Sequence, residues 1–226
     1  MGHNSLEMLP RTLRLRGVLF DWDGTLLDSY RADAQAYLQM FRALGIDWGL
    51  DKLQRHYSPN WYNVYRAARI PRARWDEADR LWRRHYRHKE ARLFPGARTV
   101  LSALQQKFVL GLVTSGSGDR VRQQLRRFKL TSRFAARIFA EDARHRKPHP
   151  APLQLALARL HLAAEECLYI GDAPADIEMA RRAGVFSVGV VGTSPVPSQL
   201  RAARPDAVIH SVAELPRLLS KLGKAK

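Results

Sequence analysis

From Phe94 to the end of the chain, segments in which apolar residues recur at helical spacing alternate with short apolar runs. This alternation is typical of a parallel β-sheet with helices on both faces, so it predicts an α/β fold. The run Val109–Val113 shows no polar alternation, as expected for a strand that is buried on both sides. We expect helices near residues 97–106, 119–129, 150–161, 175–183 and 212–222, and strands near 17–20, 108–113, 137–140, 167–170, 185–190 and 207–210.

The stretch between the first apolar run and this alternating part has a different pattern. Ala34, Leu38 and Phe41 recur at helical spacing, and Gly45 stands where such a helix would end. Four of the five tryptophans also fall here, which suits a small helical unit that must build its own core. We expect no strand in this stretch. The sequence predicts an all-helical domain over residues 29–93, inserted into an α/β domain formed by residues 15–28 and 94–226.

The chain of 226 residues carries a formal net charge of +17. A strongly basic domain can bind nucleic acid through its phosphates, or it can draw small anions toward a cleft. The sequence has neither zinc-finger spacing nor the aromatic and basic pattern of an RNA-recognition strand. We therefore do not expect nucleic acid as a partner.

Cys167 is the single cysteine, so no disulfide can form within the chain, and a reducing cytoplasm is the expected location. No apolar stretch is long enough to span a bilayer. Residues 1–16 are polar and basic and lack the apolar block of a secretory signal. We expect no membrane contact, and both a monomer and a homodimer remain open.

Two carboxylates, Asp21 and Asp23, directly follow the first apolar run. In open α/β sheets, ligands bind at the carboxyl ends of strands, so both acids can point toward one substrate atom. Gly24 then allows the chain to turn sharply. Asp and Gly are also ordinary turn residues, so a turn without any chemistry is the alternative interpretation.

Three further motifs follow in order along the chain. They are Thr114-Ser115-Gly116 after a second apolar run, Lys147 before Pro148, and Gly171-Asp172 after a third run, with Asp176 four residues beyond Asp172. Two of these motifs have a simpler interpretation: Lys147 as a surface lysine, and Asp172 as the N-cap of a helix. These simpler interpretations do not explain why all the motifs stand in this order at strand ends.

This order resembles that of the haloacid dehalogenase superfamily of phosphotransferases, which shows D-x-D-G-T, a strand ending in Thr or Ser, a Lys, and G-D-x-x-x-D. The resemblance covers the chain from about residue 17 to residue 210. It implies a Rossmann-like sheet and a helical cap of the C1 type, which closes over the active site. Within the superfamily, the chain looks most like the phosphoglycolate phosphatase group.

A carboxylate can attack phosphorus once a metal and nearby cations offset its repulsion with the phosphate. We predict that Asp21 is the nucleophile and forms an aspartyl-phosphate. We predict that Asp23 is the general acid for the leaving group and then the general base for water. The acid half of that role needs a proton on Asp23 near neutral pH, and we expect nearby negative charge to raise its pKa.

Mg²⁺ prefers oxygen ligands, and it is the expected cofactor. The resemblance implies three ligands: the carboxylates of Asp21 and Asp172 and the backbone carbonyl of Asp23. We expect Asp176 to orient these ligands from behind. For the phosphate we expect the Thr114 hydroxyl, the N–H groups of Ser115 and Gly116, and the charge of Lys147, with Gly24 close by.

Particular residues disfavour three alternative functions. Asp23 disfavours the dehalogenase branch, which lacks a second acid. Gly171 stands where the β-phosphoglucomutase branch often carries Glu, so hydrolysis is favoured over a sugar phosphomutase. An inactive domain that binds nucleic acid or a protein through its basic surface has no evident need for the complete acid, Thr and Lys set. We predict a Mg²⁺-dependent phosphatase that acts on a small phosphorylated metabolite, such as phosphoglycolate, a sugar phosphate or a nucleotide.

Overall fold

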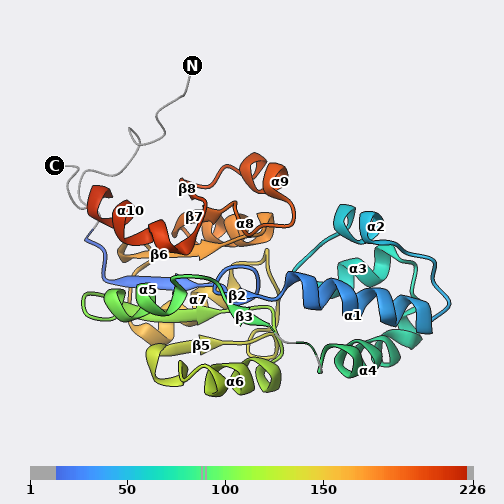
Figure 1. The fold of residues 1–226 in the computed structure, drawn as a ribbon. Helices are drawn as coiled ribbons and strands as arrows, with labels where there is room; N and C mark the ends of the chain where they lie inside the picture. The colour runs from blue at the N-terminus through green and yellow to red at the C-terminus, as the bar shows by residue number, and fades with distance from the viewer. Residues whose placement is uncertain (1–13, 88, 90, 223–226) are drawn as a thin grey trace.

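The computed structural model describes residues 14–87, 89 and 91–222. A six-stranded parallel sheet forms its centre, in the order β5-β4-β1-β6-β7-β8 (Figure 1). The strands are β1 (Gly17–Phe20), β4 (Val109–Val113), β5 (Ala136–Ile138), β6 (Cys167–Gly171), β7 (Phe186–Val190) and β8 (Ala207–Ile209). The predicted Rossmann-like α/β fold is confirmed. Residues 1–16 were expected to carry no secretory signal, and most of them lie outside the described residues. The last four residues of the predicted α/β domain, 223–226, also lie outside them.

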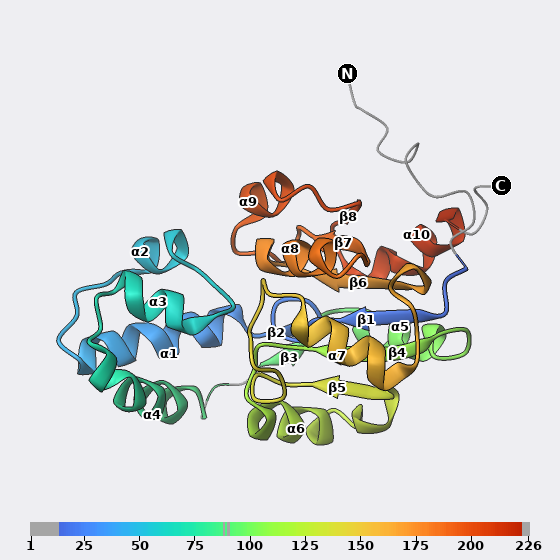
Figure 2. The same cartoon turned by 180° about the vertical axis from the view of Figure 1, so that it is seen from behind.

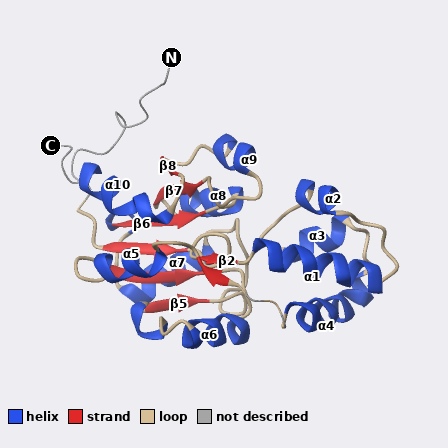
Figure 3. Cartoon of the chain, in the orientation of Figure 1, coloured by secondary structure: helices blue, strands red, loops and turns tan. Residues whose placement is uncertain are grey.

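Helices cover both faces of this sheet (Figure 3). Val18 and Phe20 of β1 pack on one face with α5 (Ala97–Leu104), α6 (Gly118–Arg127) and α10 (Leu215–Leu222). Leu19 packs on the other face with α7 (Ala151–Leu160) and α8 (Pro174–Arg182). A further helix, α9 (Pro197–Ala202), follows β7. Because both faces of β1 are buried, its sequence is apolar throughout.

Four helices between residues 30 and 86 form a helical unit that lies beside the sheet (Figures 1 and 2). They are α1 (Tyr30–Ala43), α2 (Leu50–Arg55), α3 (Trp61–Ala67) and α4 (Trp75–Tyr86). The unit has its own core, which includes Met40, Phe41, Val64 and Trp75. The helical character expected of this stretch is therefore present, and its aromatic residues supply much of the packing.

A short two-stranded ladder joins the helical unit to the sheet. β2 (Leu27–Asp28) pairs antiparallel with β3 (Arg92–Leu93), so the chain enters and leaves the helical unit at neighbouring points. The expectation of no strand within residues 29–93 was therefore wrong at Arg92–Leu93. A strand of two residues is too short to show an alternating pattern, so the sequence carries no signal for it.

Single 3₁₀ turns complete the described elements: η1 (Arg72–Arg74), η2 (Thr131–Arg133), η3 (Ala164–Glu166) and η4 (Val212–Glu214). η4 occupies the start of the helix expected near residues 212–222. A membrane-spanning helix needs about 20 apolar residues. None of the helices within the described ranges has the length and apolar character to cross a bilayer.

Candidate active site

The carboxyl ends of three adjacent strands bring the predicted motifs together. β1 lies between β4 and β6, so Asp21 after β1 lies beside Thr114 after β4 and Asp172 after β6. The backbone N–H of Asp21 still donates to the Ile170 carbonyl at 2.8 Å, which extends the ladder to the site itself. Three segments that are far apart in sequence therefore meet at one edge of the sheet.

Gly24 is required where it stands. Its φ is +78°, a conformation that residues with a side chain rarely adopt. A Cβ atom at this position would also collide with the carboxylate of Asp172. Glycine therefore allows the turn after β1 to pass directly beside Asp172.

Lys147 is buried at the centre of this site, with 2% of its surface exposed. Its Nζ donates to Asp21 Oδ1 at 2.8 Å, to Asp176 Oδ1 at 2.8 Å and to the Tyr169 hydroxyl at 2.7 Å. All three N–H groups of the ammonium are therefore used. Burial alone would lower the pKa of Lys147, but Asp176 and Asp21 outweigh it and raise that pKa. The alternative of a surface lysine is excluded.

Three buried carboxylates, those of Asp21, Asp172 and Asp176, each place one oxygen within 4.8 Å of an oxygen of the other two. Asp172 Oδ1 accepts from the Thr25 hydroxyl at 3.0 Å, whereas its buried Oδ2 has no hydrogen-bond partner. Burial, together with Asp21 and Asp176, raises the pKa of Asp172 well above its ordinary value. An unpartnered carboxylate oxygen among crowded acids fits a divalent metal ion, which would relieve the repulsion.

The start of the helix that follows Asp172 decides whether Asp172 is a helix N-cap or a free carboxylate at the strand end. The N-cap of α8 is Ala173, whose N–H donates to Asp176 Oδ2 at 3.1 Å. Asp176 therefore satisfies the start of the helix with one oxygen and binds Lys147 with the other. Asp172 is not the N-cap, so its carboxylate is available at the strand end.

The segment after β4 forms one wall of the site. The N–H of Gly116 donates to the Thr114 hydroxyl oxygen at 3.0 Å, which folds the loop tightly. The Ser115 hydroxyl is buried without a hydrogen-bond partner. Thr114, Ser115 and Gly116 all line the same cavity as Asp21 and Asp172. The Gly116 N–H is thus used within the loop, so the Thr114 and Ser115 hydroxyls are the donors that this loop offers to an oxyanion.

Asp23 has a partner that the sequence did not reveal. Arg120 on α6 donates from Nη1 to Asp23 Oδ1 at 2.9 Å and from Nη2 to Oδ2 at 2.5 Å. Burial would raise the pKa of Asp23, but Arg120 outweighs it and lowers that pKa. The expectation that nearby negative charge raises this pKa was therefore wrong. Arg120 is one arginine among many in a basic chain, so no sequence pattern distinguishes it.

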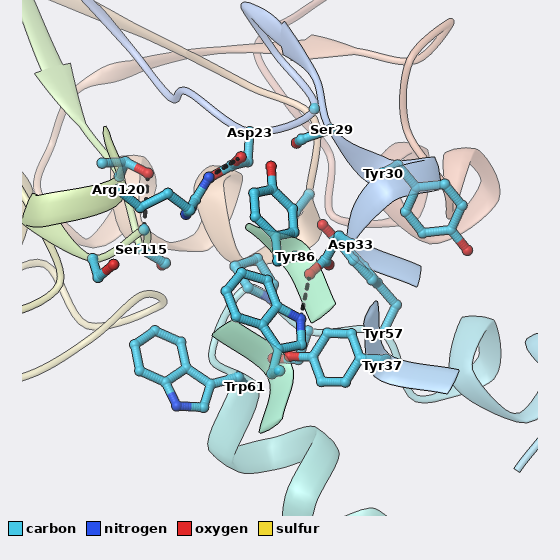
Figure 4. A pocket seen from close by; sticks show the side chains of 18 of the residues that line it. Asp23, Ser29, Tyr30, Asp33, Tyr37, Tyr57, Trp61, Tyr86, Ser115 and Arg120 are labelled. Carbon is cyan, nitrogen blue, oxygen red and sulfur yellow. Dashed lines mark hydrogen bonds and ion pairs between the residues drawn. The ribbon is translucent and has the colours of Figure 1, made fainter. Parts of the chain in front are cut away.

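A cavity of about 110 Å³ lies between these strand ends and the helical unit (Figure 4). The helical unit contributes acids and aromatic rings to its wall, including Asp33, Tyr37, Trp82 and Tyr86. Figure 4 shows the Asp23–Arg120 pair on one side of the cavity and Asp33 among the tyrosines on the other. None of these helical-unit residues was predicted from the sequence to be part of the site.

The chain is similar to known proteins in both sequence and fold. The model of the family described as haloacid dehalogenase-like hydrolase matches residues 18–190. The chain is 30% identical to phosphoglycolate phosphatase of Escherichia coli (strain K12), over 89% of this chain and 91% of that protein. It is 27% identical to pyrophosphatase PpaX of Bacillus mycoides (strain KBAB4), over 93% and 99%. A solved haloacid dehalogenase-like family hydrolase from Streptococcus pneumoniae has a TM-score of 0.81 at 22% identity, covering 92% of this chain and all of that one. The chain therefore belongs to the haloacid dehalogenase-like hydrolases.

Proposed function

We propose that this hydrolase is a Mg²⁺-dependent phosphatase, which transfers the phosphoryl group of a small phosphomonoester to Asp21 and then to water. One observation carries the proposal. Asp21 pairs with a buried cation, Lys147, at 2.8 Å, and it also belongs to the acid cluster in which Asp172 Oδ2 has no partner. The relatives named phosphoglycolate phosphatase and pyrophosphatase support hydrolysis of a phosphate bond.

The metal would be held by the carboxylates of Asp21 and Asp172 and by the backbone carbonyl of Asp23. Bound Mg²⁺ would supply positive charge that offsets the repulsion between these acids and the phosphate. Asp176 would act through Lys147, which it holds at 2.8 Å. The hard oxygen ligands of this cluster suit Mg²⁺ better than a softer metal.

The chain's own groups divide the reaction into two steps. In the first, Asp21 attacks phosphorus, the bond from phosphorus to the leaving oxygen breaks, and that oxygen takes up a proton. In the second, water attacks the phosphoryl group, Asp21 is released and inorganic phosphate leaves. Thr114 and Ser115 would bind the phosphoryl oxygens through both steps, and the positive charge of Lys147 would offset negative charge at Asp21.

Asp23 would serve the second step as the base that accepts a proton from water. Its pairing with Arg120 keeps the carboxylate ionised, which is the form that a base requires. In the first step, Asp23 would need a proton to give to the leaving oxygen. Release of the Arg120 contact on substrate binding would favour that protonated form.

We further propose that residues 29–93 form a cap domain over a core made of residues 15–28 and 94–226. The cavity is lined from both parts, so a substrate there would be enclosed between them. The chain passes from the core to the cap and back through the β2–β3 ladder, so this ladder would be the hinge. Closure would exclude water while the aspartyl-phosphate forms.

The geometry at Gly171 supports hydrolysis over a phosphomutase reaction. A Cβ at this position would overlap the Asp176 side chain, so Glu does not fit here without displacing it. Asp176 is already committed to Lys147 and to the start of α8. The residue that often marks the mutase branch is therefore sterically disfavoured at this place.

Phosphate release tests the proposal. Wild type and Asp21→Asn would be assayed on a panel of phosphomonoesters, including p-nitrophenyl phosphate, with Mg²⁺ and with a chelator. We expect wild type to release phosphate only when Mg²⁺ is present. We expect Asp21→Asn to release none under either condition. Release by a folded Asp21→Asn at the wild-type rate, or release that is unchanged by the chelator, would contradict the proposal.

A further inference from the structure

The cavity wall contains more acidic than basic side chains, although the molecule as a whole is basic. The described residues that line it include five aspartates and two arginines, although the whole chain carries +17. These residues are Asp21, Asp23, Asp33, Asp79 and Asp172, with Arg83 and Arg120. The basic surface can attract a phosphorylated substrate, but the chamber that encloses it is acidic.

Two of the acids are left over once the proposed chemistry is assigned. Asp21 and Asp172 would belong to the metal, and Asp23 is paired with Arg120 at both oxygens. The remaining two, Asp33 on α1 and Asp79 on α4, come from the helical unit. They lie on the side of the cavity that would face the leaving group.

The hydrogen bonds to these two acids come from neutral donors. Asp33 Oδ1 accepts from the indole N–H of Trp82 at 3.0 Å, and Asp79 Oδ1 accepts from the Tyr65 hydroxyl at 2.7 Å. A neutral donor holds a carboxylate in place but does not cancel its charge. Asp33 is thus held in place by a neutral donor, and because burial raises its pKa to about 7, it is a negative group on the cavity wall above that pH.

Aromatic rings surround Asp33. Figure 4 shows its carboxylate between Tyr86 on one side and Tyr37 and Tyr57 on the other. Two rings of this wall already interact with a cation: the Arg120 guanidinium carbon lies 5.2 Å from the ring centroid of Tyr86 and 6.0 Å from that of Trp82. Aromatic rings around a fixed carboxylate are the arrangement that binds ammonium and quaternary ammonium groups.

We propose that the leaving group is a small alcohol that carries a cationic nitrogen, an ammonium or a quaternary ammonium, seated against Asp33 and the rings of Tyr37, Tyr57 and Tyr86. This inference rests on the proposed phosphatase function and names its substrate class. Hydrolysis then consumes one water and gives inorganic phosphate and a free amino alcohol. A leaving group with a carboxylate, as in phosphoglycolate, would instead face Asp33 and be repelled.

The test compares two substrates of the same shape. Phosphocholine and 3,3-dimethylbutyl phosphate differ in that a quaternary nitrogen replaces a quaternary carbon, so size and apolar area are matched. At pH 8 and with Mg²⁺, we expect kcat/KM of wild type to favour phosphocholine about tenfold or more, because a cation gains most in a desolvated aromatic site. Phosphoglycolate should be the poorest of the three.

Matched variants locate the effect. Asp33→Asn should bring the ratio of the two kcat/KM values close to one. Asp76→Asn removes the same charge from an exposed position of α4 outside the cavity, and it should keep the wild-type ratio. Tyr57→Leu removes one ring of the wall and should lower the ratio severalfold, so the test survives if Asp33→Asn does not fold.

The outcomes separate this inference from the proposed function. Equal kcat/KM values for the two isosteres, or phosphoglycolate as the better substrate, would overturn the cationic leaving group and leave the phosphatase proposal intact. A preference for phosphocholine that persists in both Asp33→Asn and Tyr57→Leu would overturn the proposed binding position of the cation. No Mg²⁺-dependent hydrolysis of any substrate, p-nitrophenyl phosphate included, would overturn the phosphatase function, and the inference with it.

Discussion

The two ends of the active cavity are built by opposite means. At the strand ends, Lys147 makes three hydrogen bonds to buried groups, and Asp176 binds Lys147 with one oxygen and the start of α8 with the other. At the helical unit, the wall consists of aromatic faces with isolated acids such as Asp33. The first end is a dense ionic network that suits a single chemical group. The second is a largely aromatic surface with a few separate charged side chains, and its specificity can change through a few substitutions.

The largest expected effect comes from removing Lys147 from the ionic network at the strand ends. Lys147→Ala leaves Asp21 and Asp176 as buried charges without their cation, so we expect a loss of about 3–5 kcal/mol in the free energy of unfolding. We also expect kcat to fall by about 10²–10³-fold, because a cation beside the phosphoryl group is lost. Chemical denaturation measures the free energy of unfolding, and phosphate release measures kcat. The exposed Lys107→Ala is the control, and equal stability of the two variants would contradict the account.

Gly24→Ala separates crowding from backbone strain at the same end. Gly24 and Gly45 have similar positive φ values, +78° and +73°, but a Cβ at Gly45 meets open space and one at Gly24 meets Asp172. We expect Gly45→Ala to cost about 1 kcal/mol from strain and Gly24→Ala clearly more, with weaker Mg²⁺ binding as well. Denaturation curves and a Mg²⁺ titration of activity test this. Equal costs would show that Asp172 moves away freely.

Arg120→Ala tests the contact that joins the two ends. Arg120 holds both oxygens of Asp23 and also lies over rings of α4, so its loss frees Asp23 and removes part of the far wall. We expect kcat to fall about tenfold, because a freed carboxylate spends less time in the reactive position. Arg126→Ala, an exposed site on the same helix, should keep wild-type kcat. Equal kcat in both variants would remove Arg120 from the mechanism.

The smallest expected effect is a pH dependence at the leaving-group end. Burial, with Asp23 adding to it, raises the pKa of Asp33 to about 7, while Arg120 and the Trp82 N–H oppose the rise. The tyrosines that face Asp33 have pKa values raised above 10, so they stay neutral in this range. Asp33 is ionised above pH 7 and neutral below it. The preference for phosphocholine over its carbon isostere should therefore decline from pH 8 to pH 6 in wild type and stay flat in Asp33→Asn. A preference that rises as the pH falls would contradict this.

The same contrast explains what the sequence could predict. Strand positions followed from apolar runs such as Val109–Val113, because a strand buried on both faces leaves a continuous signal. Asp21, Thr114 and Asp172 could be grouped because each follows a strand, and adjacent parallel strands end at one edge. Their roles in catalysis stay predictions until activity is measured.

The helical end carried no comparable signal. Asp33 and Arg120 enter the site through the packing of α1 and α6, and a single acid or arginine on a helix resembles any solvated residue. The pKa of Asp23 was mispredicted for this reason, since its partner lies 97 residues away in the sequence. The β2–β3 ladder was missed because its strands have two residues each.

Mapping the phosphoryl group on the protein tests the central claim most directly. Wild-type enzyme would be mixed with p-nitrophenyl phosphate and Mg²⁺ and quenched in acid, which preserves an acyl phosphate, and its peptides would be analysed by mass spectrometry. We predict one phosphoryl group on the peptide that contains Asp21, located on Asp21 itself, and none when the substrate or Mg²⁺ is omitted. A phosphoryl group on another residue, or turnover with no phosphorylated peptide in rapid-quench samples, would contradict the account.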